Sequence, residues 1–180
     1  MDEKRAIEIL RKHSTSEKDF KIVLAHSKAM QKIALDISRK VNKAGKRKAD
    51  VQFIRAAAIL HDIGRFEYPP WKCPVRHGVA GEQILKKEGM GRKYQRVCST
   101  HLGAGITAAD VRRQKLPIPA KDYMPRTVEE KILCYADRRV KLTRPIRIGT
   151  ELKRAAKYGK AAVERLQKLH DEIECMMKCN

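Results

Sequence analysis

The segment AAAILHDIGR, residues 56–65, is the stretch around which the rest of the chain is organised. Its alanine, isoleucine and leucine residues form an apolar run, which is typical of a buried helix. Gly64 follows the pair His61-Asp62 closely, and a glycine just past the last periodic residue is a common helix ending. We therefore expect a helix over about 49–63, with the His-Asp pair on its last turn at the edge of a buried face.

Four further ionisable residues lie on apolar helical stripes or at their ends, each in a different predicted helix. They are His26, His77, His101 and Asp137. Burying an imidazole or a carboxylate costs free energy unless the group is paired or bound to a metal. A core histidine bonded to a backbone carbonyl, or an aspartate paired with an arginine, would explain each residue alone. Several such residues on separate helices favour one shared site.

The composition predicts a single all-α domain. A chain of 180 residues is long enough to bury a sizeable core. Aromatic residues make up only 5% of the chain, β-branched runs are short, and there is no internal repeat or linker. We expect one domain over residues 1–180, with its core over roughly 19–140 and flanking helices at 2–13 and 150–178.

The chain shows no feature of a membrane or secreted protein. No apolar stretch approaches the length of a membrane span, and the N-terminus lacks the apolar core of a signal peptide. Five cysteines, at positions 73, 98, 134, 175 and 179, are odd in number and contain no CxxC pair. They are therefore expected to be reduced thiols in a cytoplasmic protein, with Cys98 and Cys134 in the core.

The chain is strongly basic, with 41 lysine and arginine residues against 21 acidic ones and a net charge of +20. This charge favours phosphate-rich partners such as nucleotides or nucleic acid. The basic residues are spread along the chain, with denser clusters at 43–48 and 138–147, and no fingerprint of a nucleic-acid-binding fold is present. A small phosphate substrate is therefore the expected partner, and nucleic acid is the second candidate.

A proline-rich loop over 66–76 follows the His-Asp pair and contains the only tryptophan. It has two interpretations of equal weight. It is either a lid that presents Arg65, Lys72 and Arg76 to phosphate, or a loop held to the core by its aromatic residues.

The spaced pattern His26, His61-Asp62, Asp137 resembles the HD superfamily of metal-dependent phosphohydrolases. Residues 61–64 spell the variant of its motif that is often called HDIG. The resemblance implies a single-domain helical bundle of the HD type.

Two groups within this superfamily are particularly similar. The bacterial HD-type diadenosine tetraphosphate hydrolases share His77-Gly78 and the tripeptide at 135–137. A prokaryotic HD group of unassigned substrate is closer still over residues 122–137.

The resemblance also implies a ligand set for two metals. His26, His61, Asp62 and Asp137 would hold the first ion, and two additional histidines between the motif and the last aspartate are typical of two-metal members. Asp62 would bridge to a second ion held by His77 and His101. Mixed nitrogen and oxygen ligands suit Fe, Mn, Co, Ni or Zn better than Ca.

The predicted function is a metal-dependent phosphohydrolase, a phosphomonoesterase or phosphodiesterase acting on a nucleotide or related phosphate. Two cations would activate a water molecule and neutralise the phosphoryl charge. Asp62 and Arg65 are the predicted catalytic residues, with Arg65, Lys72 and Arg76 as candidate phosphate contacts. The alternative is a basic helical module that binds RNA or a nucleotide and has a non-catalytic metal site.

Overall fold

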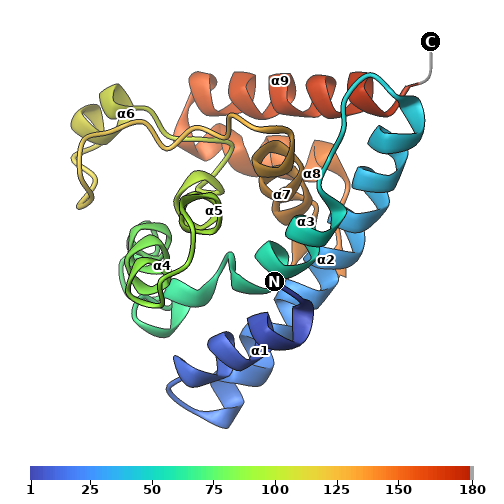
Figure 1. Ribbon diagram of the computed structural model, residues 1–180. Coiled ribbons are helices and arrows are strands. Elements are labelled where there is room, and N and C mark those ends of the chain that lie inside the picture. The colour runs from blue at the N-terminus through green and yellow to red at the C-terminus, as the bar shows by residue number, and fades with distance from the viewer. Residues whose placement is uncertain (179–180) are drawn as a thin grey trace.

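The computed structural model describes residues 1–178 and is mainly helical with very little strand, as the composition predicts (Figure 1). The helices are α1 (Glu3–Lys12), α2 (Glu17–Ala44), α3 (Val51–Leu60), α4 (Arg76–Lys87), α5 (Arg92–Thr100), α6 (Ala108–Arg113), α7 (Val128–Arg138), α8 (Ile148–Ala155) and α9 (Lys160–Met177), with 3-10 turns η1 (Ile63–Phe66) and η2 (Ala156–Tyr158). A small antiparallel pair, β1 (Val140–Lys141) and β2 (Arg144–Pro145), was not predicted. Among the described helices, none combines the length and apolarity needed to cross a membrane.

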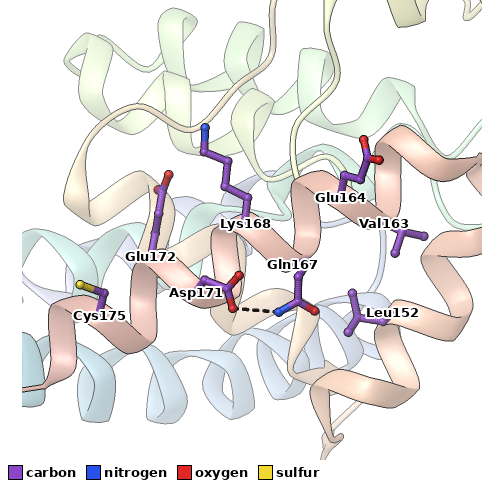
Figure 2. Close-up of a pocket in the computed structure, with 8 residues that line it drawn as sticks. All are labelled: Leu152, Val163, Glu164, Gln167, Lys168, Asp171, Glu172 and Cys175. Atoms are coloured by element: carbon purple, nitrogen blue, oxygen red, sulfur yellow. Dashed lines mark hydrogen bonds between the residues drawn. The ribbon is translucent and has the colours of Figure 1, made fainter.

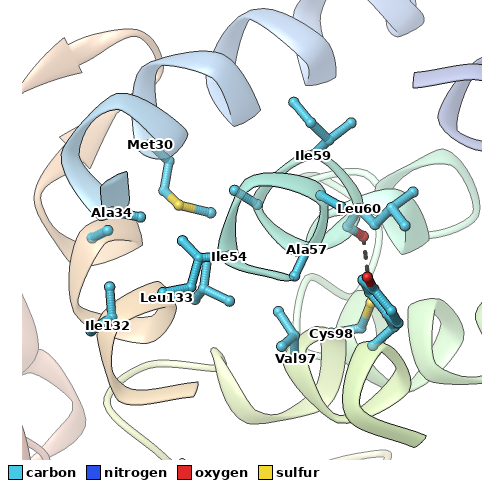
Figure 3. Packing of buried hydrophobic residues seen from close by; sticks show 14 of the residues in the cluster. Met30, Ala34, Ile54, Ala57, Ile59, Leu60, Val97, Cys98, Ile132 and Leu133 are labelled. Carbon is cyan, nitrogen blue, oxygen red and sulfur yellow. Dashed lines mark hydrogen bonds between the residues drawn. The ribbon is translucent and has the colours of Figure 1, made fainter. Parts of the chain in front are cut away.

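Helix α3 lies at the centre of the core, because nearly all of its side chains are apolar and buried. It packs against α1, α2, α5 and α7. Figure 3 shows Ile54 and Ala57 of this helix among side chains from α2, α5 and α7. The alanines at 56–58 are small, which lets neighbouring helices approach the α3 backbone closely. The end of α3 is therefore enclosed by other elements, and this is where the His-Asp pair lies.

Helices α2 and α7, which pack against α3, each have an end fixed by the local sequence. Helix α2 ends at Gly45, whose φ of 77° lies in the left-handed region that glycine adopts without strain. Helix α7 begins with a capping box, in which the Thr127 side chain accepts from the Glu130 backbone N–H and the Glu130 side chain accepts in return. Both α2 and α7 pack against α3 and against each other. They bring His26 and Asp137 to the same end of the core.

Gly64 has a different role from the one that the sequence suggested. Helix α3 ends at Leu60, earlier than the expected 63, and Gly64 lies inside η1. A Cβ atom at Gly64 would overlap the carbonyl oxygen of His77 and lie 2.6 Å from the backbone nitrogen of Gly81. The position therefore requires glycine because α4 packs directly on the η1 backbone, and not because a helix has to stop there.

The C-terminal region forms two helices, α8 and α9. Gly159, whose φ is 94°, lies between them. Helix α9 packs on α2 and α7 through Leu166, Leu169 and Ile173. His170 was expected at the surface, and it is partly buried there. Its Nδ1 atom lies 2.8 Å from the Tyr135 hydroxyl, with which it shares a hydrogen bond, and the two rings stack.

The cysteine predictions agree with the structure where it describes them. Cys98 and Cys134 are buried in the core, and Cys73 and Cys175 are also free thiols. Burial raises the pKa of the Cys134 thiol to about 12, so it stays protonated. Cys179 lies outside the described residues.

Candidate metal centre

Six side chains from five regions of the chain converge at one end of the core. They are His26 of α2, His61 and Asp62 at the end of α3, His77 in the first turn of α4, His101 at the end of α5 and Asp137 in the last turn of α7. All except His26 are buried, and His26 is partly buried. All six were candidate ligands in the sequence, and the structure brings all six together.

Each of the four imidazoles is held through its Nδ1 atom by a backbone carbonyl oxygen. The pairs are His26 with Leu142, His61 with Ala58, His77 with Pro74 and His101 with Val97. A carbonyl oxygen only accepts, so each Nδ1 carries the proton and donates. In the neutral imidazole the Nε2 atom then presents a lone pair, which is the arrangement commonly seen in histidine ligands to metals.

Two of these Nε2 atoms lie within hydrogen-bond distance of each other, and a third has no partner. The Nε2 atoms of His77 and His101 are 2.8 Å apart, although both would present lone pairs. The Nε2 atom of His61 is buried and has no hydrogen-bond partner within residues 1–178. Only a proton or a cation relieves such a meeting of acceptors, and a divalent metal fits the donor set.

The two carboxylate oxygens of Asp62 face different histidines. Its Oδ1 atom lies 3.2 Å from the Nε2 atom of His77 and 3.4 Å from that of His101. Its Oδ2 atom lies 3.7 Å from the Nε2 atom of His26 and 3.8 Å from that of His61. One carboxylate thus stands between two histidine pairs.

Asp137 also divides its two oxygens. Its Oδ1 atom lies 3.1 Å from the Nε2 atom of His26 and 3.7 Å from that of His61. Its Oδ2 atom accepts a hydrogen bond from Arg138. An arginine partner and a metal were the alternatives in the sequence. The structure shows the arginine pair, and the other oxygen of Asp137 stays toward the two histidines.

Five of the six residues, all except His77, form two compact groups in which the ligand atoms lie within 4.8 Å of one another. The first group is His26, His61 and Asp137, and the second is His61, Asp62 and His101. Both groups contain nitrogen and oxygen donors, which suits divalent transition metals.

The charged groups of the site keep both carboxyls ionised. Burial alone would raise the pKa of Asp62, but the surrounding His61, Arg65, His101 and His77 together outweigh it and hold this pKa well below its usual range. Burial likewise opposes ionisation of Asp137, but Arg138, His26 and His61 together outweigh it, so the pKa of Asp137 is also well below its usual range. Two negative charges are therefore available to a cation at this buried position.

A cavity of about 420 Å³ opens beside this cluster. His77 and His101 line it together with Arg65, whose Nε atom donates to the Oδ1 atom of Asp62 at 3.2 Å. Two other predicted phosphate contacts do not line it. Arg76 donates instead to the Pro117 carbonyl oxygen, and Lys72 lies over the ring of Tyr68.

The sequence analysis missed one side of this cavity. Residues of α8, η2 and α9 contribute to its lining, although 150–178 was expected only to flank the core. The available signal was the run of basic residues around Tyr158, next to the helix-breaking Gly159. That signal does not reveal which part of the core the run faces.

A second, larger hollow lies along α8 and α9 (Figure 2), with a volume of about 660 Å³. Its lining includes Leu152, Val163, Gln167 and Cys175, and none of the six converging residues. Gln167 donates to Asp171 within it. This hollow is lined by carboxylates and a thiol but by no histidine.

The chain matches the model of the HD domain family over residues 23–141. This match covers more than half of the chain, and the chain therefore belongs to the HD domain family, as its motif indicated. Together with the donor cluster, this membership supports a metal-dependent phosphohydrolase in general terms.

Three proteins with similar sequences illustrate what this chain is related to. An uncharacterised protein of Methanocaldococcus jannaschii is 33% identical over 99% of this chain and all of its own length. A tRNA (cytidine(56)-2′-O)-methyltransferase of Picrophilus torridus is 32% identical over 96% of this chain, and that of Thermoplasma volcanium is 31% identical over 94%. The chain spans about half of each methyltransferase, 46% of its length.

Solved structures of the same fold include the HD domain of the phosphodiesterase PgpH from Listeria monocytogenes. Without ligand, that domain has a TM-score of 0.57 and 14% identity, and the comparison covers 97% of this chain and 88% of that one. The same domain in complex with cyclic-di-AMP has a TM-score of 0.56 over 98% of this chain and 87% of that one. At this identity the comparison establishes the fold.

Proposed function

We propose that this protein is a phosphohydrolase that uses two divalent metals to hydrolyse a phosphate ester of a nucleotide. The observation that carries the proposal is the position of Asp62, whose two oxygens face two different histidine pairs. Two cations about 3.5–4 Å apart need an anion between them, and a buried, ionised carboxylate meets that need.

The same distances support a ligand assignment. His26, His61, Asp62 and Asp137 would hold one ion, and Asp62, His77 and His101 would hold the other. When bound, the ions supply an activated water nucleophile and neutralise the charge of the phosphoryl group. The backbone carbonyls that hold each Nδ1 fix the ring orientations, so the site is assembled before any substrate arrives.

Arg65 is the residue that we assign to substrate phosphate. It lines the cavity, it touches Asp62, and its Nη1 atom has no partner among the described residues. A planar guanidinium suits the oxygens of a phosphate group, which it can bind through two N–H donors. Lys72 and Arg76 remain candidates for phosphate contact only if the 66–76 loop rearranges, since neither lines the cavity.

A metal analysis followed by activity assays tests the function. Purified protein should contain close to two transition-metal ions per chain and should hydrolyse at least one nucleotide, a phosphomonoester or a phosphodiester, in a panel supplied with Mn, Fe, Co or Ni. Full metal occupancy without turnover on any phosphomonoester or phosphodiester would contradict the proposal and leave a structural metal site.

A second candidate function is RNA binding. Two relatives are named as tRNA methyltransferases, and this chain matches about half of each. The net charge of +20 suits a polyanion. We propose tRNA as the partner to test first. Affinity for tRNA that falls steeply with salt, without phosphate release, would favour this function over hydrolysis.

A further inference from the structure

One wall of the cavity comes from beyond the matched HD region. The family match ends at residue 141, and α8, η2 and α9 follow it. Arg154, Lys157 and Tyr158 of this segment line the same cavity as His77 and His101. The chain therefore places a second set of side chains, from outside the matched domain, beside its metal cluster.

Ion pairs connect this segment to the cluster. Glu151 of α8 is only 5% exposed and accepts from Arg138 at 3.3 Å and from Arg154 at 2.7 Å. Arg138 also donates to Asp137, a candidate metal ligand. A continuous series of charged contacts thus joins Asp137 to α8, and truncating one member would leave a buried charge unpaired. The series sets where α8 lies relative to the cluster.

A second buried carboxylate anchors the start of α9. Asp110 of α6 is 2% exposed, completes a capping box with Thr107 and pairs with Arg165 at 2.9 Å. Arg113 pairs with the same carboxylate. With both α8 and α9 anchored, the η2 turn between them has a defined position at the cavity.

The cavity carries an excess of positive charge. Its lining contains five basic side chains and two carboxylates, apart from the histidines. The basic residues are Arg65, Arg138, Arg154, Lys157 and Arg165, and the carboxylates are Asp110 and Glu151. Three of the arginines retain a buried nitrogen without a partner in the described chain. This lining favours an anionic ligand.

Tyr158 adds an aromatic surface to this basic cavity. It is 70% exposed, and of the large apolar residues exposed among the described positions it is the one that lines the cavity. Aromatic side chains near basic groups bind nucleobases by stacking, whichever base is present. The volume of about 420 Å³ falls in the range that holds one small ligand.

We propose that the segment 154–158 binds the nucleoside part of a nucleoside phosphate, with Tyr158 stacked on the base and Lys157 near the sugar-phosphate. The phosphate group would lie toward Arg65 and the metal cluster. This inference rests on the proposed hydrolase function and names its substrate class. Specificity for a base then comes from the C-terminal helices, and the phosphate chemistry comes from the HD core.

The test compares AMP, which contains a base, with ribose 5-phosphate, which does not. Metal-loaded full-length protein is titrated calorimetrically with AMP and with ribose 5-phosphate, and hydrolysis of both is measured in parallel. Tyr158→Ala should weaken AMP binding and raise its KM roughly 5- to 150-fold, the effect of losing one base stack. Ribose 5-phosphate should be unaffected, and Tyr158→Phe should behave as the wild type.

Control variants outside the cavity test where the base of AMP binds. Trp71→Ala removes a second exposed aromatic, 82% exposed, that does not line the cavity. Lys160→Ala is the control for Lys157→Ala. The side chain of Lys160 is 90% exposed and does not line the cavity. Trp71→Ala and Lys160→Ala should leave AMP affinity unchanged, and Lys157→Ala should lower it.

Three outcomes would overturn the inference. Equal affinity of the wild type for AMP and ribose 5-phosphate would exclude base recognition, even with hydrolysis intact. Equal losses for both ligands in Tyr158→Ala would make Tyr158 merely structural, and a loss of AMP affinity in Trp71→Ala would move the base to the 66–76 loop. Base-dependent binding without any hydrolysis would instead retain the inference and reject the proposed hydrolase.

Discussion

At the scale of single residues, the site depends on which polar atoms already have a hydrogen-bond partner. The Nδ1 atoms of four histidines are bound to backbone carbonyls, so their Nε2 atoms are left facing the cluster. Asp137 gives one oxygen to Arg138 and keeps the other toward two histidines. Both oxygens of Asp62 face histidines, and Oδ1 accepts a hydrogen bond from Arg65 as well. Asp62 is therefore the residue whose charge matters most.

Replacing Asp62 with asparagine should abolish hydrolysis while the fold persists. Asparagine keeps the shape and one acceptor oxygen but loses the charge that would separate two cations. Metal content should fall toward one ion per chain, with the circular dichroism spectrum unchanged. Metal stoichiometry and turnover, measured on one preparation, check this. A variant with full metal and full activity would remove Asp62 from the site.

Replacing Arg65 with alanine should lower kcat/KM by about 10- to 100-fold with metal content unchanged, since a charge-assisted hydrogen bond to phosphate is worth about 1.5–3 kcal/mol. The control is Lys46→Ala with Lys48→Ala, because both lysines are exposed and absent from the cavity lining. Steady-state kinetics on the three proteins make the comparison. Loss of activity in the double lysine variant alone would move the phosphate site to the 43–48 cluster.

At the scale of elements, the site depends on close contact between η1, α4 and α5. Gly78 and Gly81 lie against α5, where added Cβ atoms would come within 2.7 Å of the Cys98 carbonyl oxygen and 2.9 Å of its Cβ atom. Gly64 meets α4 from the other side. Three glycines thus let α4 approach both neighbours, and this approach brings His77 to His101 and Asp62.

Replacing Gly64 with alanine should destabilise the protein by about 1–3 kcal/mol or more, the usual cost of overpacking a core. The obstacle is backbone of α4, which cannot rotate away as a side chain would. The matched control is Gly149→Ala, in the first turn of α8, where a Cβ atom would meet nothing within 4 Å. That control should be neutral or stabilising, because alanine favours helix. Urea denaturation of both variants measures the difference, and equal midpoints would contradict the packing account.

At the scale of the whole molecule, the cluster joins segments that are far apart in the sequence. His26 and Asp137 are separated by 111 positions in the sequence, yet the His26 Nε2 atom lies 3.1 Å from the Asp137 Oδ1 atom. Elements α2, α3, α4, α5 and α7 each contribute at least one ligand candidate. A metal bound there would tie five elements to one another and would be absent from the unfolded chain. Metal binding should therefore stabilise the whole fold.

Removing metal with a chelator should lower the melting temperature. An ion present at 100 times its dissociation constant contributes about 2.7 kcal/mol, which corresponds to roughly 5–11 °C for a domain of this size. Differential scanning calorimetry before and after EDTA treatment, with Mn or Co added back, measures the shift. The same treatment of a His61→Ala variant should have little effect. An unchanged melting temperature in the wild type would speak against any tightly bound ion.

The sequence alone determined the helical class, the HD motif and the six candidate ligands, because helical periodicity and residue type are local properties. His26 and Asp137 were identifiable as ionisable residues on apolar stripes, whatever they faced. Tertiary structure decided three further matters. It showed that Gly64 is required by the backbone of α4, that His170 pairs with Tyr135, and that Tyr158 joins the cavity. Each of these depends on which distant segment packs against the residue, and periodicity carries no information about the partner.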